Sequence, residues 1–226
     1  MKIRLNNFQN DIYLFDGTVT IIEIHNAKYF SKLIQNINDK INGYESDEII
    51  LLSENDELLK FEKETMLIID FYNIDFNSKK ILAKIYSNIS ENIKNKQSSE
   101  FEILLNNLRH YIDMELIDFP FDFELKETIS IEDILKVFSL KIENLSYQTN
   151  LERIELLIDI ISTLKLAKIL ILPNLKLYFD EKELIEIYKY SMYNEIKLVL
   201  LERACESKLK YEQILCIDEN FDDYMY

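Results

Sequence analysis

The chain has 226 residues, 48% of them hydrophobic, and its 41 acidic and 26 basic side chains give a formal net charge of −15. No run of about 18 apolar residues is present to span a membrane, and the N-terminus lacks the basic-then-apolar pattern of a signal peptide, so a soluble, cytoplasmic protein is expected. Two glycines, Gly17 and Gly43, are too few to build a loop whose backbone N–H groups close around a phosphate. Composition therefore argues against a nucleotide-hydrolysing enzyme and, averaged over the surface, against non-specific nucleic-acid binding.

The first third of the chain is predicted to combine several strands with one helix. Residues 1–24 hold two or three strands, and a helix begins near Asn26, where apolar residues recur at helical spacing. The clearest of these strands is expected at residues 18–24, and further strands are expected at residues 48–52 and 65–70, with residues 58–61 as an additional candidate. The last of these ends in Asp70, as a metal-holding acidic strand does in NTPase folds, although here the glycine loop is missing.

The middle of the chain has a different, helical character. Ile81, Ile85, Ile89 and Ile93 recur every fourth residue, and a second helix begins at Ser99 after a short polar turn. Two such helices make an antiparallel pair. Because the pair is inserted between strands, we expect a helical leg lobe at residues 77–119 and an α/β head domain formed by residues 1–76 and 120–226.

The final third contains the clearest pattern, a strand–helix–strand unit at residues 168–202. Its strands are short, nearly continuous apolar runs, and Asp180 with Glu183 forms a capping box at the start of the intervening helix. A βαβ unit of this kind is typical of a parallel sheet covered on both faces, so the fold class is predicted to be α/β with a mostly parallel sheet. Other elements are expected at residues 120–124 (strand), 130 onward (short helix), 140–143 (strand), 149–164 (helix) and 213–217 (strand).

Charge is unevenly distributed around the leg lobe. Residues 77–97 carry five lysines and one acid, and Lys80, Lys84 and Lys94 lie on the helix face opposite the isoleucine stripe, where they form a candidate phosphate-facing surface. On charge alone, Lys79, Lys80 and Lys84 are chosen as the candidate phosphate contacts. Residues 100–133 carry ten acids. Asp122 and Glu124 are two apart on the expected strand, so both side chains leave one face, and Glu127 follows closely. Converging carboxylates without histidine or cysteine suit Ca²⁺ rather than zinc. From the residues alone, solvated surfaces are the favoured interpretation of both charge runs.

The remaining chemically versatile side chains are scattered. His25 and His110 belong to no nucleophile motif and are interpreted as ordinary polar positions. Cys205 and Cys216 are interpreted as buried or bystander thiols rather than a disulfide or metal site.

Several segments in chain order resemble the small CRISPR-associated adaptation protein of type II-A systems, the ring-forming family that encircles double-stranded DNA ends. The segments that carry the resemblance are Gly17-Thr18 before an apolar strand, Phe30-Ser31-Lys32, Met66 to Asp70, Asp75 to Ser78 before Ile81-Leu82, Phe121 to Glu124 with Ile129, Ile134 to Lys136, Lys141 to Glu143, the βαβ unit and Ile217-Asp218-Glu219. Together they extend over nearly the whole chain.

The resemblance implies a head like a degenerate P-loop NTPase without the phosphate loop, and a homotetramer with lysine-lined DNA at its centre. It also implies a Ca²⁺ role for Asp122, Glu124 and Glu127, with Glu115 as a fourth ligand, and no enzymatic activity. The expected partners are linear double-stranded DNA ends, the CRISPR integrase complex and the effector nuclease, in the bacterial cytoplasm. Two alternatives stay open, a metal-dependent nuclease built from Asp70 and the acidic cluster, and a protein–protein adaptor that does not bind DNA.

Overall fold

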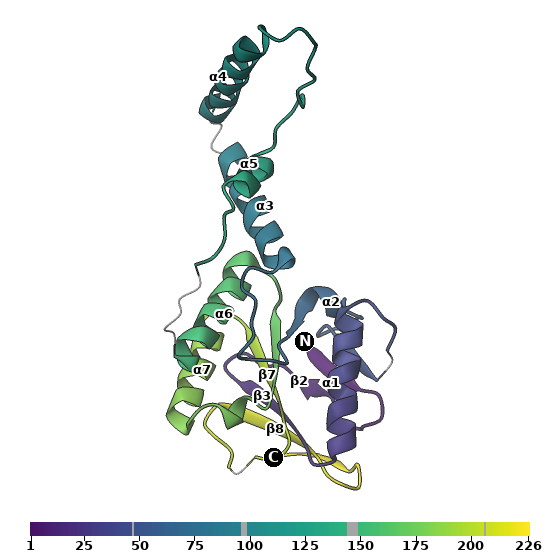
Figure 1. The fold of residues 1–226 in the computed structure, drawn as a ribbon. Helices are drawn as coiled ribbons and strands as arrows, with labels where there is room; N and C mark the ends of the chain where they lie inside the picture. Colours follow the sequence, from purple (N-terminus) through teal and green to yellow (C-terminus); the bar gives the residue numbers. More distant parts are fainter. Residues whose placement is uncertain (47, 96–98, 144–148, 206) are drawn as a thin grey trace. The chain divides into compact units, whose positions relative to one another are not determined.

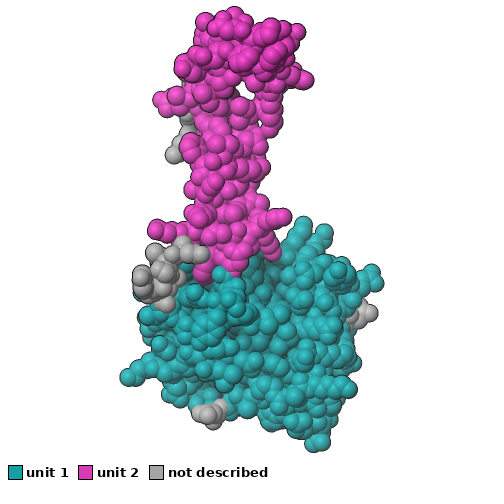
Figure 2. Space-filling view, viewed as in Figure 1, with its two compact units in different colours: residues 1–74, 145–226 teal, residues 75–144 magenta. Residues whose placement is uncertain are grey.

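The computed structural model describes residues 1–46, 48–95, 99–143, 149–205 and 207–226. Its residues form two compact units, coloured separately in Figure 2. Unit 1 contains residues 1–74 and 145–226, and unit 2 contains residues 75–144. Among the described residues, no helix combines the length and apolar character that a membrane-spanning segment needs.

Unit 1 is built around a six-stranded sheet in the order β5-β6-β7-β3-β8-β9 (Figure 1). The strands are β3 (Val19–Ile24), β5 (Thr65–Leu67), β6 (Ile169–Pro173), β7 (Lys197–Glu202), β8 (Glu212–Ile217) and β9 (Asp223–Met225). The first five strands of that order are parallel and only β9 is antiparallel to its neighbour. The mostly parallel α/β sheet predicted from the sequence is therefore confirmed, including the βαβ unit of β6, α7 and β7.

Helices follow the strands with the start signals that the sequence carries. Asn26 caps α1 (Ala27–Ile41) by accepting a hydrogen bond from the Tyr29 N–H group, while Thr149 and Asp180 begin α6 (Asn150–Leu164) and α7 (Glu181–Tyr193) with complete capping boxes. A short helix α2 (Phe61–Glu64) and a 3-10 turn η1 (Leu175–Leu177) complete the helical content of unit 1 as described.

A second, smaller sheet has the order β2-β1-β4, from β1 (Lys2–Leu5), β2 (Ile12–Tyr13) and β4 (Ile49–Leu52). Its inward residues join one face of α1 and alternate residues of the large sheet in a common hydrophobic core. Leu33 and Ile37 of α1 are fully buried in that core. Alternation along β3 sends Ile22 and Ile24 into it, so Glu23 points to the opposite face of the sheet.

Unit 2 contains α3 (Lys79–Asn95), α4 (Ser99–Leu116) and α5 (Ile131–Val137). Ser130 and Asp133 form the capping box of α5, as the sequence predicts. The antiparallel pairing of α3 with α4 is wrong, because α5 rather than α4 packs along α3, and α4 extends beyond the end of α3 (Figure 1). The turn that joins them, residues 96–98, lies outside the described residues.

Several further features differ between the expected elements and the structure. Residues 120–124 and 140–143 form no strand, and residues 58–61 contribute one isolated bridge, Leu52 to Leu58, before α2 begins. The strand expected to reach Asp70 ends at Leu67. Residues 120–143 also group with α3 and α4 rather than with the sheet, because α5 covers α3 and the Asn77 side chain exchanges hydrogen bonds with the Ile142 backbone. The second segment of unit 1 begins at residue 145, whereas the sequence was interpreted with a head segment from residue 120.

Candidate functional site

The three candidate DNA-binding lysines lie together at the start of α3. Lys79, Lys80 and Lys84 are all exposed, while Ile81 on the same helix is buried. Within the described ranges none of the three lysines forms an ion pair. An exposed, unpaired ammonium group at the end of a flexible stem is well suited to contact a phosphate without reading sequence.

The candidate calcium ligands are exposed and spread along an irregular segment. Asp122, Glu124 and Glu127 follow α4 without forming a strand, and Glu115 lies in the last turn of α4. Carboxylate oxygens are the ligands Ca²⁺ prefers. Among the described residues, however, these four do not form a set of three or more ligand atoms within 4.8 Å of one another. The donor chemistry thus suits calcium, but these four carboxylates do not converge in the part of the chain that the structure describes.

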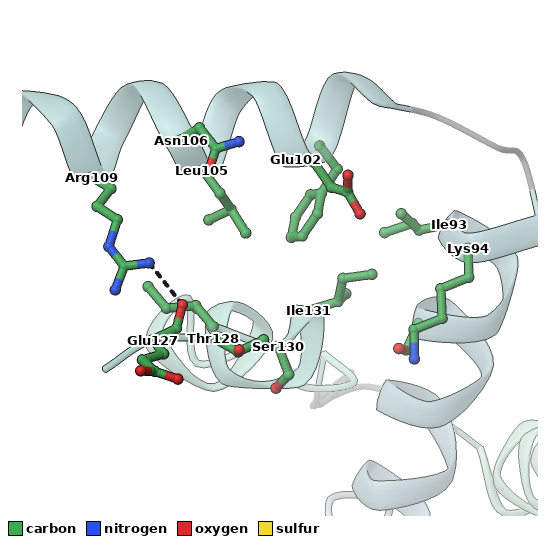
Figure 3. Close-up of a pocket in the computed structure, with 13 residues that line it drawn as sticks. Ile93, Lys94, Glu102, Leu105, Asn106, Arg109, Glu127, Thr128, Ser130 and Ile131 are labelled. Carbon is green, nitrogen blue, oxygen red and sulfur yellow. Dashed lines mark hydrogen bonds between the residues drawn. The ribbon is translucent and has the colours of Figure 1, made fainter. Parts of the chain in front are cut away.

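Hydrogen bonds and an ion pair hold the C-terminal end of this acidic segment to α4 and to the first turn of α5. The Arg109 guanidinium on α4 donates hydrogen bonds to the carbonyl oxygens of Lys126 and Glu127, each at 2.7 Å. Figure 3 shows the bond to Glu127. The Lys126 ammonium contacts the Asp133 carboxylate at 2.6 Å, and hydrogen bonds from Lys126 and Ser130 hold the pKa of Asp133 well below its ordinary value. These contacts fix residues 126–130 between α4 and α5.

The same residues border a cleft of about 730 Å³ inside unit 2 (Figure 3). Its lining mixes apolar side chains such as Leu105 and Ile131 with charged ones such as Glu102, Lys94 and Arg109. The lining residues include no histidine or cysteine, so the cleft offers no base of neutral pKa and no thiol nucleophile.

Asp70, the carboxylate considered for a nuclease, has a local structural role. One of its oxygens accepts hydrogen bonds from the backbone N–H groups of Tyr72 and Asn73, and the other accepts one from the Asn73 side chain at 2.6 Å. The Asn73 side-chain hydrogen bond is the main reason that the pKa of Asp70 is lowered. This carboxylate therefore closes the turn after β5.

A cluster that sequence reasoning missed lies at the carboxyl end of β3. His25 Nε2 is 2.8 Å from Glu23 Oε1 and 3.6 Å from Cys216 Sγ, and the three side chains bring one ligand atom each within 4.8 Å of the others. Burial opposes ionisation of Glu23, but hydrogen bonds from Tyr226 and His25 outweigh it and lower the pKa of Glu23. His25 and Cys216, interpreted separately from the sequence, are neighbours in space.

Only part of this cluster could have been found in the sequence. The Glu23-x-His25 spacing places two ligand types on one side of a strand end. Cys216 lies 191 residues away from His25. It arrives through the parallel register of β3 with β8, in which Glu23 pairs with Cys216, and no sequence signal fixes that register.

Fold and site together define a class of protein: an α/β protein with a largely parallel sheet, a separate helical unit and an exposed lysine surface. A model of the family described as CRISPR-associated protein (Cas_Csn2) matches residues 43–221, so the chain belongs to the Csn2 family. This confirms the resemblance to the type II-A adaptation protein.

Individual relatives agree over most of their length. The chain is 24% identical over 225 residues to CRISPR-associated protein Csn2 of Enterococcus faecalis, a match that covers 98% of this chain and 97% of that one. It is 26% identical over 188 residues to the Csn2 of Streptococcus agalactiae, covering 82% of each. A crystal structure of Stu0660 of Streptococcus thermophilus has the same fold, with a TM-score of 0.56 at 14% identity, over 96% of this chain and 74% of that one.

Proposed function

We propose that this chain is a non-enzymatic DNA-binding protein of CRISPR adaptation, which assembles in the bacterial cytoplasm as a tetrameric ring around double-stranded DNA ends during spacer acquisition. Membership of the Csn2 family over residues 43–221 is the observation that carries the proposal. Under this proposal the integrase complex and the effector nuclease are its protein partners.

The charge distribution supports a DNA ligand confined to one surface. A net charge of −15 repels DNA from most of the exterior, whereas Lys79, Lys80 and Lys84 offer unpaired positive charge on α3. In a ring, each subunit would present these lysines to the central hole. Together they would form a continuous phosphate-binding surface that binds DNA more strongly than the lysines of one subunit.

Self-association is supported by α4, which exposes more apolar surface than a helix of a monomer ordinarily does. On α4, Leu104 and Tyr111 are about two-thirds exposed, at 66% and 67%, and Ile117, which directly follows the helix, is 68% exposed. A second subunit that covers this helix would bury side chains that water now surrounds.

Calcium is proposed to act on the assembly through Asp122, Glu124 and Glu127, with Glu115 as a further ligand. Because their carboxylates are exposed and apart in the single chain, the ion would have to draw the irregular segment together. Binding of this kind orders a segment at an entropic cost, so affinity in the weak range of flexible calcium sites is expected.

The short connection between β3 and α1 supports the proposal that the protein is not an enzyme. In parallel sheets of the P-loop type, the loop after the central strand cradles phosphate. Here β3 ends at Ile24 and α1 begins at Ala27, with Asn26 as its cap, so two residues replace the loop. We therefore describe the head as a degenerate P-loop-type domain and expect no turnover of ATP.

Two assays separate this function from its alternatives. Incubation of linear and nicked DNA with Mg²⁺ or Mn²⁺ should leave both intact, and cleavage that is lost in Asp70→Asn would establish the nuclease instead. A gel-shift with linear duplex should show saturable binding, and its absence would leave the protein–protein adaptor. Light scattering in the presence of Ca²⁺ should give the mass of a tetramer, and the same measurement without Ca²⁺ shows whether the ion is needed for assembly.

A further inference from the structure

We propose that Glu23, His25 and Cys216 form a transition-metal site, with Zn²⁺ as the preferred ion, at the carboxyl end of β3 and β8. This site lies in unit 1 and differs chemically from the calcium ligands proposed above, which belong to unit 2. It contains one carboxylate, one imidazole and one thiol, whereas the calcium candidates are carboxylates only.

The ligand types point to zinc. Thiolate and imidazole are the soft and borderline ligands that zinc accepts and that calcium avoids. In a tetrahedral zinc site the nitrogen and sulfur ligands lie about 3.6 Å apart, and the nitrogen and oxygen ligands about 3.3 Å apart. The corresponding separations here are 3.6 Å for His25 Nε2 to Cys216 Sγ and 2.8 Å for His25 Nε2 to Glu23 Oε1. Small side-chain rotations would bring the three atoms to zinc-binding distances.

Further hydrogen bonds orient the ligands. The Tyr226 hydroxyl donates to Glu23 Oε2 at 2.6 Å, which leaves Oε1 facing His25. Tyr224 pairs with Cys216 across β8 and β9, so its side chain lies beside the sulfur on the same face of the sheet. Such outer contacts are the usual accompaniment of protein metal ligands, because they fix the orientation that the ion requires.

The position in the sheet also favours a ligand site. In open parallel sheets ligands bind outside the carboxyl ends of the strands, where the order of the strands reverses. β3 lies between β7 and β8 in the sheet although it precedes both in the chain by well over a hundred residues, so its carboxyl end lies at such a reversal. The side chains of Glu23 and Cys216 are buried, and His25 is 35% exposed, which leaves an entry path from solvent on the imidazole side.

Metal binding here has a defined proton balance. Zn²⁺ replaces the proton on the Cys216 sulfur, which is released to solvent, while the imidazole binds through its neutral Nε2 and the carboxylate through Oε1. Three protein ligands leave the fourth tetrahedral position to a water molecule. Nothing is oxidised or reduced in this step.

Co²⁺ is the probe that reports the thiolate directly. The full-length protein, freed of metal by dialysis against chelator, should bind a single equivalent of Co²⁺ with a thiolate-to-cobalt charge-transfer band in the near ultraviolet. Zn²⁺ should displace the Co²⁺, and millimolar Ca²⁺ should not. No band at an equimolar ratio, or displacement by Ca²⁺, would overturn the proposal.

Matched cysteine variants assign the ligand. Cys216→Ser should lose the band, whereas Cys205→Ser, which removes the other thiol, should keep it. Glu23→Gln and His25→Gln should each weaken binding by more than the roughly 10–100-fold typical of an outer-shell change, and Tyr226→Phe by an amount within that range. Urea midpoints of the metal-free proteins check folding. A well-folded Cys216→Ser protein with the wild-type band would refute the site.

Discussion

The Tyr188 hydroxyl donates a 2.6 Å hydrogen bond to Glu212 Oε1 in the interior of unit 1. The same oxygen is 2.7 Å from the Lys176 ammonium, so one carboxylate atom serves a neutral and a charged donor. Tyr188 is fully buried on α7, and Glu212 begins β8. The contact therefore joins α7, the helix that connects β6 to β7, to β8, which is separated from β7 by β3 in the sheet.

Removal of this hydroxyl should destabilise the head. Tyr188→Phe keeps the packed ring but leaves a buried carboxylate short of one donor, which typically costs about 2 kcal/mol. Urea unfolding of the Tyr188→Phe protein should show that loss. Tyr190→Phe is the matched control. The Tyr190 hydroxyl donates a hydrogen bond to Asp159 at 2.7 Å in a half-buried setting, where water can replace the hydroxyl. The Tyr190→Phe protein should therefore lose less than about 1 kcal/mol of unfolding free energy. Equal losses would place the anchoring role elsewhere.

Glu202 should make the stability of the head depend on pH. Burial raises the pKa of this carboxyl from its ordinary 4.5 to about 7, although the Lys176 backbone N–H donates to it. Between these two pH values the unfolded chain releases the proton of Glu202 while the folded chain retains it. The contribution of Glu202 to the free energy of unfolding is therefore fully present below about pH 4.5 and is lost as the pH rises through 7. The shift corresponds to a loss of about 3 kcal/mol.

Glu202→Gln tests this dependence, because an amide keeps the acceptor oxygen and cannot ionise. The free energy of unfolding of the variant should lose this downward slope between pH 5 and about 8, and at the upper end the variant should be the more stable protein. Exposed Glu57 provides the control, and Glu57→Gln should follow the wild-type curve. A Glu202→Gln curve parallel to wild type would show that another group titrates.

Much of this architecture could be predicted from local signals. Apolar residues at helical spacing after Asn26 and the capping boxes at Thr149 and Asp180 predicted three helices, and continuous apolar runs predicted β6 and β7. These signals act within a few residues of each other, so a single sequence contains them.

Long-range placement could not be predicted. Residues 120–124 alternate as a strand does, but they form no strand in the structure. The apolar positions of α4 predicted that α4 would pack on α3, whereas α5 packs on α3 in the structure. Pairing of Glu23 with Cys216 depends on strand order, which local propensity does not encode. The lysines of α3 were identified correctly as exposed because charge at helical spacing is itself a local signal. Their role stays a prediction, as does that of the four acidic residues.

Calcium should raise the melting temperature through the acidic segment. A ligand that binds only the native or assembled state stabilises it by mass action. We expect millimolar Ca²⁺ to shift thermal unfolding of the wild type, and the shift to disappear in Asp122→Ala plus Glu124→Ala. The matched control is Glu100→Ala plus Glu102→Ala, which removes the same charge from the first turn of α4. A full shift in the first double variant would place the ions elsewhere.

Charge reversal on α3 should weaken DNA binding uniformly across sequences. Lys80→Glu plus Lys84→Glu removes two phosphate contacts per subunit and should reduce the salt dependence of the affinity. Lys182→Glu plus Lys189→Glu makes the same charge change on exposed positions of α7 and should leave binding nearly unchanged. Fluorescence anisotropy of several labelled duplexes of unrelated sequence, at more than one salt concentration, measures both. An equal loss in the two double variants would mean that overall charge, not α3, governs binding.

Competition between DNA with and without ends tests the ring most directly. A closed ring loads over an end, whereas an open patch of lysines binds any duplex, so the topology of the DNA distinguishes them where sequence and charge do not. A plasmid and its linearised form should be compared as competitors against a labelled linear duplex at one salt concentration, after assembly of the protein. The proposed function predicts that the linear form competes and the covalently closed circle does not. Equal competition by the two forms would contradict it.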